Sequence, residues 1–175
     1  MSPTELKIRQ RHLMKSKDKK KFLINLQENF GGNEETVTKI VSAKSKIEWV
    51  KLDQNQELFA IDDVMTFWLV DGIYIPLLSY LMKYPNAPFK YVIVDHGAIK
   101  FVSKGADVMR PGITTFDPKI KKGDVVLVKD PVHNRVLSVG QAMYDTDEME
   151  AMTKGKVLKC IHSLTDAIWQ FSKNF

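Results

Sequence analysis

Length, composition and charge bound what this chain can be. It has 175 residues, 44% of them hydrophobic, a formal net charge of +5 and a pI of about 9.2. This is enough for one average domain or two small ones with a buried core, and the basic balance favours a polyanionic partner such as nucleic acid. The single cysteine, Cys160, excludes an internal disulfide, and no apolar run approaches the roughly 20 residues that span a membrane. We therefore expect a cytoplasmic protein with no membrane partner.

The positive charge is concentrated at the start of the chain. Residues 1–21 hold eight lysines and arginines but only two acidic residues, so this segment outweighs the rest of the sequence in net charge. Such a cluster could bind RNA, or it could be the solvated face of a helix. Both interpretations stay open, because apolar residues are interleaved with the cations. Residues 2–16 fit either one strand or one short helix face.

The first half of the chain predicts helices on either side of a strand meander. Helical spacing runs from residue 18 to residue 30 and stops at Gly31-Gly32, and a second apolar stripe follows around Val37. The period then changes to about two. Four strands are expected, at residues 47–52, 57–61, 64–70 and 73–75. Asp71-Gly72 is a strong hairpin signal between the last two, and residues 77–84 predict a closing helix.

A domain boundary is predicted at Pro85 and Pro88, because two prolines in four residues exclude helix and weaken sheet. The first domain is expected to comprise residues 1–88, with an α+β fold, and the second residues 89–175. Beyond the boundary, strands are expected at residues 91–94, 125–128, 136–143 and 157–162, with a small helix beginning near Asp145. So many short strands in so few residues favour a small mixed barrel.

One stretch of the second domain, from Asp95 to Ile113, has the residues expected of a binding segment. It predicts a short helix, a glycine exit, a strand and a Pro-Gly turn. The spacing predicts that Ala98, Phe101 and Val102 share a helix face that docks on a sheet. Lys100 and Lys104 share another face, which points outward. Arg110 adds a third cation, and no acid or base is arranged there for bond-breaking chemistry.

This stretch, Asp-His-Gly-Ala-Ile-Lys-Phe-Val-Ser-Lys-Gly-Ala-Asp-Val-Met-Arg-Pro-Gly-Ile, resembles the opening of a PUA domain, a small RNA-binding β-pseudobarrel. The Gly-Ala pair after the helix and the Pro-Gly pair after the strand carry the likeness, which spans about residues 90–172. The segment ending in Lys83-Tyr84-Pro85 and the run from Ile161 to Trp169 resemble the malignant-T-cell-amplified-sequence and translation-machinery-associated proteins, of which ligatin is a larger relative. Members carry a pre-PUA domain of this length before the PUA domain, and this chain looks like an archaeal-type stand-alone member.

The resemblance implies a non-enzymatic RNA-binding protein of translation. Eukaryotic members act on the small ribosomal subunit in non-standard initiation, reinitiation and removal of deacylated tRNA. They usually work with a density-regulated protein that carries an initiation-factor-like domain. The expected partners are therefore rRNA or tRNA, the small ribosomal subunit and a separate initiation-factor-like protein. No catalytic residue, metal or cofactor is implied.

The resemblance also implies where RNA binds. In PUA domains the helix and the loop and strand after it line a groove, and a tRNA acceptor end is a common ligand. Carried over by position, the groove residues are Lys100, Ser103, Lys104, Gly105, Ala106, Asp107, Met109, Arg110, Pro111 and Gly112. The lysines would neutralise phosphates, and the backbone at Gly105-Ala106 would hydrogen-bond exposed bases. Alternatively, Lys100 and Lys104 form an ordinary solvated face, and Arg110 pairs with Asp107.

The cysteine, the histidines and the paired aspartates of the sequence are expected to have structural roles. Cys160 and His162 lie two apart on a predicted strand, but one cysteine and four scattered histidines do not suit a four-ligand zinc site. Neighbours on one strand rarely reach attack geometry either, so a buried thiol and an edge histidine are expected. Asp62-Asp63 predicts a turn. Two other functions stay open: an RNA-modification enzyme or its targeting subunit, and a protein-binding adaptor that has lost RNA binding. The lack of phosphate-loop, dinucleotide and nucleophile-elbow motifs before residue 89 counts against the enzyme.

Overall fold

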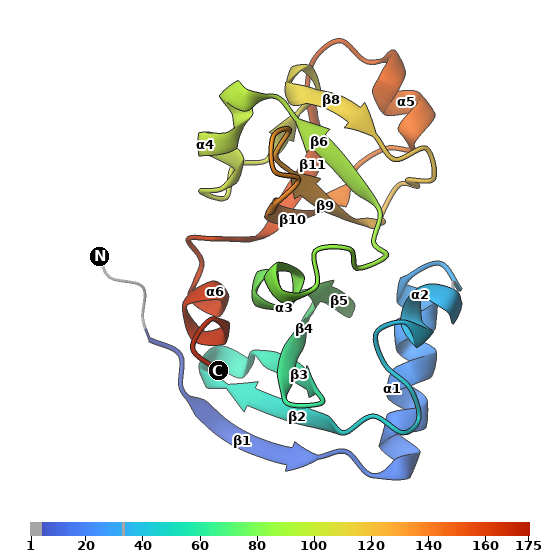
Figure 1. Cartoon of the computed structure of the whole chain (residues 1–175), viewed down its shortest axis with the longest axis vertical. Coiled ribbons are helices and arrows are strands. Elements are labelled where there is room, and N and C mark those ends of the chain that lie inside the picture. Colours follow the sequence, from blue (N-terminus) through green and yellow to red (C-terminus); the bar gives the residue numbers. More distant parts are fainter. Residues whose placement is uncertain (1–4, 33) are drawn as a thin grey trace. The chain divides into compact units, whose positions relative to one another are not determined.

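The computed structural model describes residues 5–32 and 34–175 (Figure 1). The chain forms two compact units. The first consists of the chain up to Pro88 together with Gln170–Phe175, and the second of Phe89–Trp169. The sequence prediction placed residues 170–175 in the second domain, whereas they group with the first unit, where the Arg11 guanidinium lies 4.9 Å from the centre of the Phe175 ring. A cation over an aromatic face is an attractive contact that the sequence pattern does not reveal.

The first unit is built on a five-stranded antiparallel meander in the order β1-β2-β3-β4-β5. The strands are β1 (Ile8–Leu13), β2 (Ile47–Leu52), β3 (Glu57–Ile61), β4 (Val64–Val70) and β5 (Ile73–Pro76). The four predicted strands are confirmed within a residue. Two of their hairpins turn on residues with left-handed backbone, Asp62-Asp63 with φ of 49° and 68° and Asp71-Gly72 with φ of 49° and 78°. Both therefore have the positive φ pair that a tight two-residue hairpin requires.

Strand β1 forms one edge of this sheet. All six of its residues are exposed, including Ile8 and Leu13, and its pairing with β2 shifts register between Ile8 and Gln10. Its two arginines reach acids of the neighbouring segment: Arg11 pairs with Glu48 at 2.5 Å, and Arg9 pairs with Asp53. The strand is thus held by ion pairs and ladder hydrogen bonds more than by burial.

Helices complete the first unit: α1 (Ser16–Asn29), α2 (Glu34–Thr38), the 3₁₀ turn η1 (Asp53–Asn55) and α3 (Leu78–Lys83). Helix α1 buries Phe22 and Leu26 while its lysines face outward, as its spacing predicts. Lys19 is an exception, because its Nζ donates to the carbonyls of Ala43 and Ser45 at 2.8 and 2.5 Å. In the helices that the structure describes, no segment is both long and apolar enough to cross a membrane.

The second unit is a six-stranded sheet that curls toward a barrel, in the order β7-β11-β10-β9-β6-β8 (Figure 1). Its strands are β6 (Tyr91–Val94), β7 (Val108–Met109), β8 (Ile113–Phe116), β9 (Val125–Lys129), β10 (Val136–Ala142) and β11 (Lys156–Ser163). Strands β6 and β9 pair in parallel and the other neighbours antiparallel. Its helices are η2 (His96–Ala98), α4 (Ile99–Val102), η3 (Arg110–Gly112), α5 (Thr146–Ala151) and α6 (Ala167–Ser172), the last running across the division between the units. The α+β fold class with a pseudobarrel second half is confirmed.

The core of the second unit comes from the inward residues of this sheet, such as Val92, Val126, Val128 and Leu158. Gly140 marks a bulge in β10. The register with β11 shifts between Val139 and Gly140, and a Cβ at Gly140 would lie only 2.9 Å from the Lys159 carbonyl oxygen. The bend of β10 therefore depends on a residue without a side chain.

Candidate nucleic-acid interface

The candidate interface begins with a short helical segment after β6. Asp95 caps it, with its Oδ1 accepting a hydrogen bond from the Ala98 amide at 2.9 Å. The 3₁₀ turn η2 passes directly into α4, and the chain leaves through Gly105, whose φ is +96°. A Cβ at Gly105 would be strained by this positive φ and would lie 3.2 Å from Ser163 Oγ, a tight contact, so the exit favours glycine.

The predicted orientation of Phe101 is wrong. Val102 is buried, and Ala98 and Ile99 pack against the core, but 59% of Phe101 is exposed. The inward stripe consists of Ala98, Ile99 and Val102, which are spaced i, i+1 and i+4 and lie close together around the helix, so Phe101 falls beyond the edge of this stripe. The aromatic ring therefore lies on the surface, beside the cation of Lys100, whose Nζ is 5.0 Å from the ring centre.

A hollow of about 490 Å³ lies between α4 and β7. Its walls are mostly apolar, and Phe101 and Met109, each about half exposed or more, contribute large side chains to them. It is lined by Ala98, Phe101, Val102, Ala106, Asp107, Val108, Met109, Gly112 and Lys156. An open apolar recess flanked by lysines offers stacking surface for a planar ring and positive charge for an attached anion.

Asp107 is the acidic residue of this lining, and both its oxygens are engaged. Oδ2 pairs with Lys156 Nζ at 2.7 Å, and Oδ1 accepts a hydrogen bond from the Cys160 amide at 2.7 Å. The hydrogen bond from Lys156 lowers the pKa of Asp107, and burial opposes this only in part. The carboxylate thus ties β7 to β11, and Lys156 compensates its negative charge.

Arg110 has an internal role. Its guanidinium lies 4.9 Å from the centre of the Phe116 ring, and its nitrogens donate to the carbonyls of Ile113 at 3.3 Å and Glu150 at 3.5 Å. The alternative interpretation, a pair with Asp107, is not what forms, because Asp107 pairs with Lys156. Arg110 therefore fixes the turn after β7 and does not line the hollow.

The structure brings together only part of the predicted groove. Ala106, Asp107, Met109 and Gly112 line the hollow. Lys100, Lys104 and Pro111 are exposed residues of the same loop and helix, whereas Ser103 bonds back to the Ile99 carbonyl at 2.6 Å. Sequence reasoning missed Ala98, Phe101, Val102, Val108 and Lys156 as lining residues. Strand pairing brings Lys156 to the hollow, because Lys156 lies opposite Met109 in the β7–β11 ladder.

The thiol and imidazole of β11 are placed for structural roles. Burial raises the pKa of the Cys160 thiol to about 11, so the thiol is protonated at neutral pH. His162 is fully buried and its Nδ1 lies 2.7 Å from Asp166 Oδ2. His162, expected as an edge histidine, is instead covered on all sides, with the Asp166 carboxylate beside its ring.

Two family models match consecutive parts of the sequence: a Pre-PUA-like domain over residues 3–85 and a PUA domain over residues 90–164. The chain belongs to the pre-PUA and PUA domain family. An uncharacterized protein of Methanocaldococcus jannaschii is 38% identical, covering 95% of this chain and 99% of its own. Translation machinery-associated protein 20 of Saccharomyces cerevisiae is 30% identical, covering 94% of each chain.

A solved structure shares the whole architecture of this pre-PUA and PUA protein. The crystal structure of a hypothetical protein of Pyrococcus horikoshii matches 93% of this chain and 99% of its own with a TM-score of 0.81 and 30% identity. Malignant T-cell-amplified sequence 1-A of Xenopus laevis is 30% identical, covering 82% of this chain and 81% of its own. With the yeast relative, it confirms the predicted resemblance to the malignant-T-cell-amplified-sequence and translation-machinery-associated proteins.

Proposed function

We propose that this protein is a non-enzymatic RNA-binding protein of the translation machinery, and that the hollow between α4 and β7 holds an unstacked base at an accessible RNA end. The observation that carries the proposal is the exposed pair Phe101 and Met109 on the walls of this hollow, with Lys100 beside the Phe101 ring. Lys104 is a second exposed cation on the same segment. Single-stranded RNA is bound by stacking its bases on such side chains while cations neutralise its phosphates.

Relatives support the association with translation. The yeast relative is named for the translation machinery, and its similarity extends over almost the whole of both chains. The PUA domain model covers the segment that contains the hollow. We therefore propose rRNA or tRNA and the small ribosomal subunit as partners in the cytoplasm, with an initiation-factor-like protein as a separate partner.

A binding titration tests the site assignment. Fluorescence anisotropy with labelled tRNA carrying an intact 3′ end is measured across a salt series for the wild type and for Lys100→Glu combined with Lys104→Glu. We expect the double variant to bind about tenfold or more weakly at low salt and to have a salt slope smaller by about 1.4, because each of the two neutralised phosphates of a single strand contributes a slope of about 0.7.

The matched control is Lys119→Glu combined with Lys122→Glu, which reverses two exposed lysines of the same unit outside the lining of the hollow. Equal losses in both double variants would mean that only overall charge matters and that the hollow is not the site. Unchanged tRNA and rRNA affinity in the Lys100 and Lys104 variant would also contradict the proposal. Binding to ribosomal subunits that survives nuclease treatment would instead support a protein-binding adaptor.

A further inference from the structure

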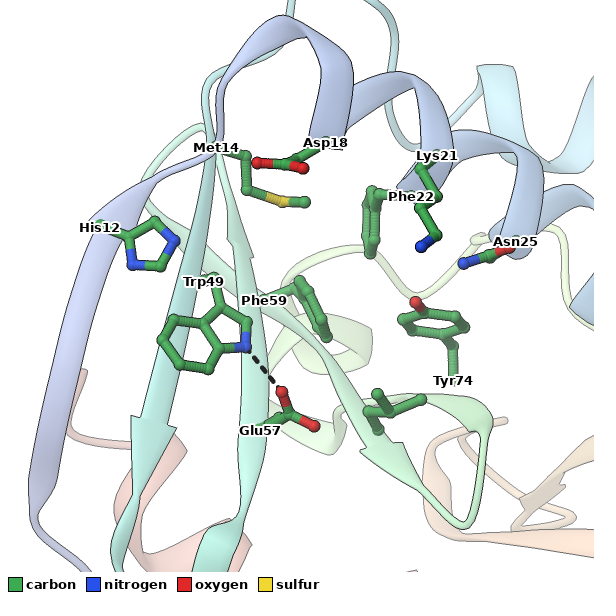
Figure 2. Close-up of a pocket in the computed structure, with 11 residues that line it drawn as sticks. His12, Met14, Asp18, Lys21, Phe22, Asn25, Trp49, Glu57, Phe59 and Tyr74 are labelled. Atoms are coloured by element: carbon green, nitrogen blue, oxygen red, sulfur yellow. Dashed lines mark hydrogen bonds between the residues drawn. The ribbon is translucent and has the colours of Figure 1, made fainter.

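A second hollow, of about 330 Å³, lies in the first unit between α1 and the sheet (Figure 2). Figure 2 shows His12 and Trp49, from β1 and β2, on one side, and Lys21, Phe22 and Asn25 of α1 on the other. Pockets that hold small ligands measure about 300–1,000 Å³, so this hollow suits a single planar group better than a large ligand.

Aromatic rings dominate its walls. Phe22, Phe59 and Tyr74 pack together with ring centres 4.8–5.5 Å apart and are almost fully buried. Beside them on the same face of the sheet, Trp49 pairs across the strands with Phe59 and is partly exposed, and the exposed His12 lies 4.8 Å from it with its ring tilted by 45°. A flat ligand entering between these two sets would find ring faces available on at least one side.

Polar groups of three kinds face the same space. Glu57 accepts a hydrogen bond from Trp49 Nε1 at 2.9 Å (Figure 2), which fixes the carboxylate and the indole relative to each other. Burial raises the pKa of Tyr74, while a hydrogen bond with Asn25 opposes the shift. Lys21 adds a cation and Asp18 a second carboxylate. Carboxylates are acceptors only, so this lining matches a ring edge that carries N–H donors.

The surroundings decide between two classes of ligand. Aromatic walls and carboxylates alone would also suit the cationic side chain of a protein partner. However, Lys15, Lys17, Lys20 and Lys21 are exposed on or beside α1, and Lys17 and Lys21 are one helical turn apart. This local excess of positive charge repels a cationic segment and attracts a polyanion.

We propose that this hollow binds one unstacked nucleobase of single-stranded RNA, with Lys17 and Lys21 neutralising the adjoining phosphates. The base would stack between Trp49 and the aromatic wall, and its N–H donors would reach Glu57 or Asp18. Guanine, which presents both an N1–H and an amino group on one edge, fits this acceptor pair better than uracil. The site lies in a different unit from the hollow between α4 and β7 and would bind RNA independently of it.

Nuclear magnetic resonance of the full chain gives a local test, because Trp49 Nε1–H lies at the hollow. The ¹⁵N-labelled protein carrying Lys100→Glu and Lys104→Glu is titrated with a short unstructured RNA, then with GMP and UMP. Trp49→Phe assigns the resonance, and the indoles of Trp68 and Trp169 are internal references. We expect the Trp49 signal to shift with RNA, and to shift more with GMP than with UMP, while the reference signals stay in place.

Affinities in the same background complete the test. We expect Trp49→Ala to weaken RNA binding about tenfold through lost stacking, and His12→Ala to weaken it a few-fold. His12 is exposed, so its removal does not endanger the fold. Lys21→Gln should reduce the salt slope by about 0.7, whereas Lys83→Gln, which removes an exposed cation elsewhere in the first unit, should not.

Three outcomes would overturn the proposal. The Trp49 signal could stay fixed as RNA is added, or His12→Ala and Lys21→Gln could bind RNA as the parent does. The signal could also move with an arginine-rich peptide and not with RNA, which would make the ligand a protein. Because the Lys100 and Lys104 substitutions are present throughout, failure here leaves the assignment of the hollow between α4 and β7 unaffected.

Discussion

At the scale of single residues, Phe101 is the side chain whose exposure is hardest to explain by folding alone. A ring that is 59% exposed gains little from burial, so its removal should scarcely change stability. We predict that Phe101→Ala weakens binding of single-stranded RNA about tenfold, because one stacking surface is lost, while the free energy of unfolding in urea changes by less than about 0.5 kcal/mol.

Val132→Ala is the matched control for this prediction, since Val132 is an equally exposed apolar residue of the same unit outside the hollow. Its RNA affinity should equal that of the wild type. A loss of stability in Phe101→Ala that accounts for its loss of binding would show that the ring supports the fold and does not contact RNA.

Gly140 gives a prediction about stability. An alanine there places its Cβ about 2.9 Å from the Lys159 carbonyl oxygen, which belongs to the backbone of the neighbouring strand and cannot rotate away. We predict that Gly140→Ala costs about 1–3 kcal/mol of unfolding free energy, measured by chemical denaturation. Ser138→Ala is the control on the same strand: its buried Oγ has no hydrogen-bond partner, so the change should be near neutral. Equal costs at both positions would contradict the steric explanation.

Residue orientations were the least predictable part of the candidate site. The sequence shows Phe101 and Val102 at equivalent helical spacing from Ala98, and only the side on which the helix docks, with Ile99 as well as Ala98 and Val102 facing the core, decides that Phe101 is exposed and Val102 buried. Arg110 looks like a free cation in the sequence, yet carbonyls and the Phe116 ring occupy its guanidinium. Such partners are set by the fold around the residue and not by its neighbours in sequence.

At the scale of elements, Asp107 links the two-residue strand β7 to β11. Its folded-state pKa is lowered, chiefly by Lys156, so its ionised form stabilises the fold. This contribution is fully present above the ordinary carboxyl pKa of 3.8 and is lost as the pH falls through the lowered value. We predict that Asp107→Asn is less stable than the wild type at neutral pH, and that the difference shrinks as the pH falls below 3.8.

Denaturant unfolding of both proteins at a series of pH values checks this linkage. Asp147→Asn, which removes an exposed carboxylate from α5 of the same unit, controls for the loss of one negative charge. A stability difference between Asp107→Asn and the wild type that stays constant into strong acid would contradict the ion pair with Lys156 as its cause.

Elements themselves were predicted well where the local chemistry leaves few alternatives. The strands of the meander are bounded by left-handed turns at Asp62-Asp63 and Asp71-Gly72, so their limits could be predicted from sequence. The second helix is shorter than its apolar stripe, because α2 ends at Thr38 and Val41 is buried from the loop beyond. The strand pairing of Lys156 with Met109 joins segments that are far apart in the chain, so no local sequence pattern predicts it.

At the scale of the whole molecule, the charge distribution and the two hollows raise the question of whether one RNA occupies both. With a short RNA that can occupy either hollow but not both, we predict that combining Lys21→Gln with Lys100→Glu and Lys104→Glu loses more binding free energy than the sum of the separate losses, because in each separate variant the intact hollow still binds. With a long RNA that occupies both hollows at once, the losses should add, since both contacts contribute to the same complex at high effective concentration. Anisotropy titrations with short and long single strands check this, and a more-than-additive loss with both RNAs would contradict a shared ligand.

The open edge of the first sheet has a consequence for colloidal behaviour. An unpaired strand edge is a template for pairing with another copy of the chain, and β1 presents one with both Ile8 and Leu13 exposed. The irregular register after Ile8 interrupts that template, and the arginines at positions 9 and 11, held in ion pairs with acids of the neighbouring segment, place charged side chains along the edge. These features would therefore keep concentrated protein monodisperse, in addition to any attraction the basic start of the chain exerts on RNA.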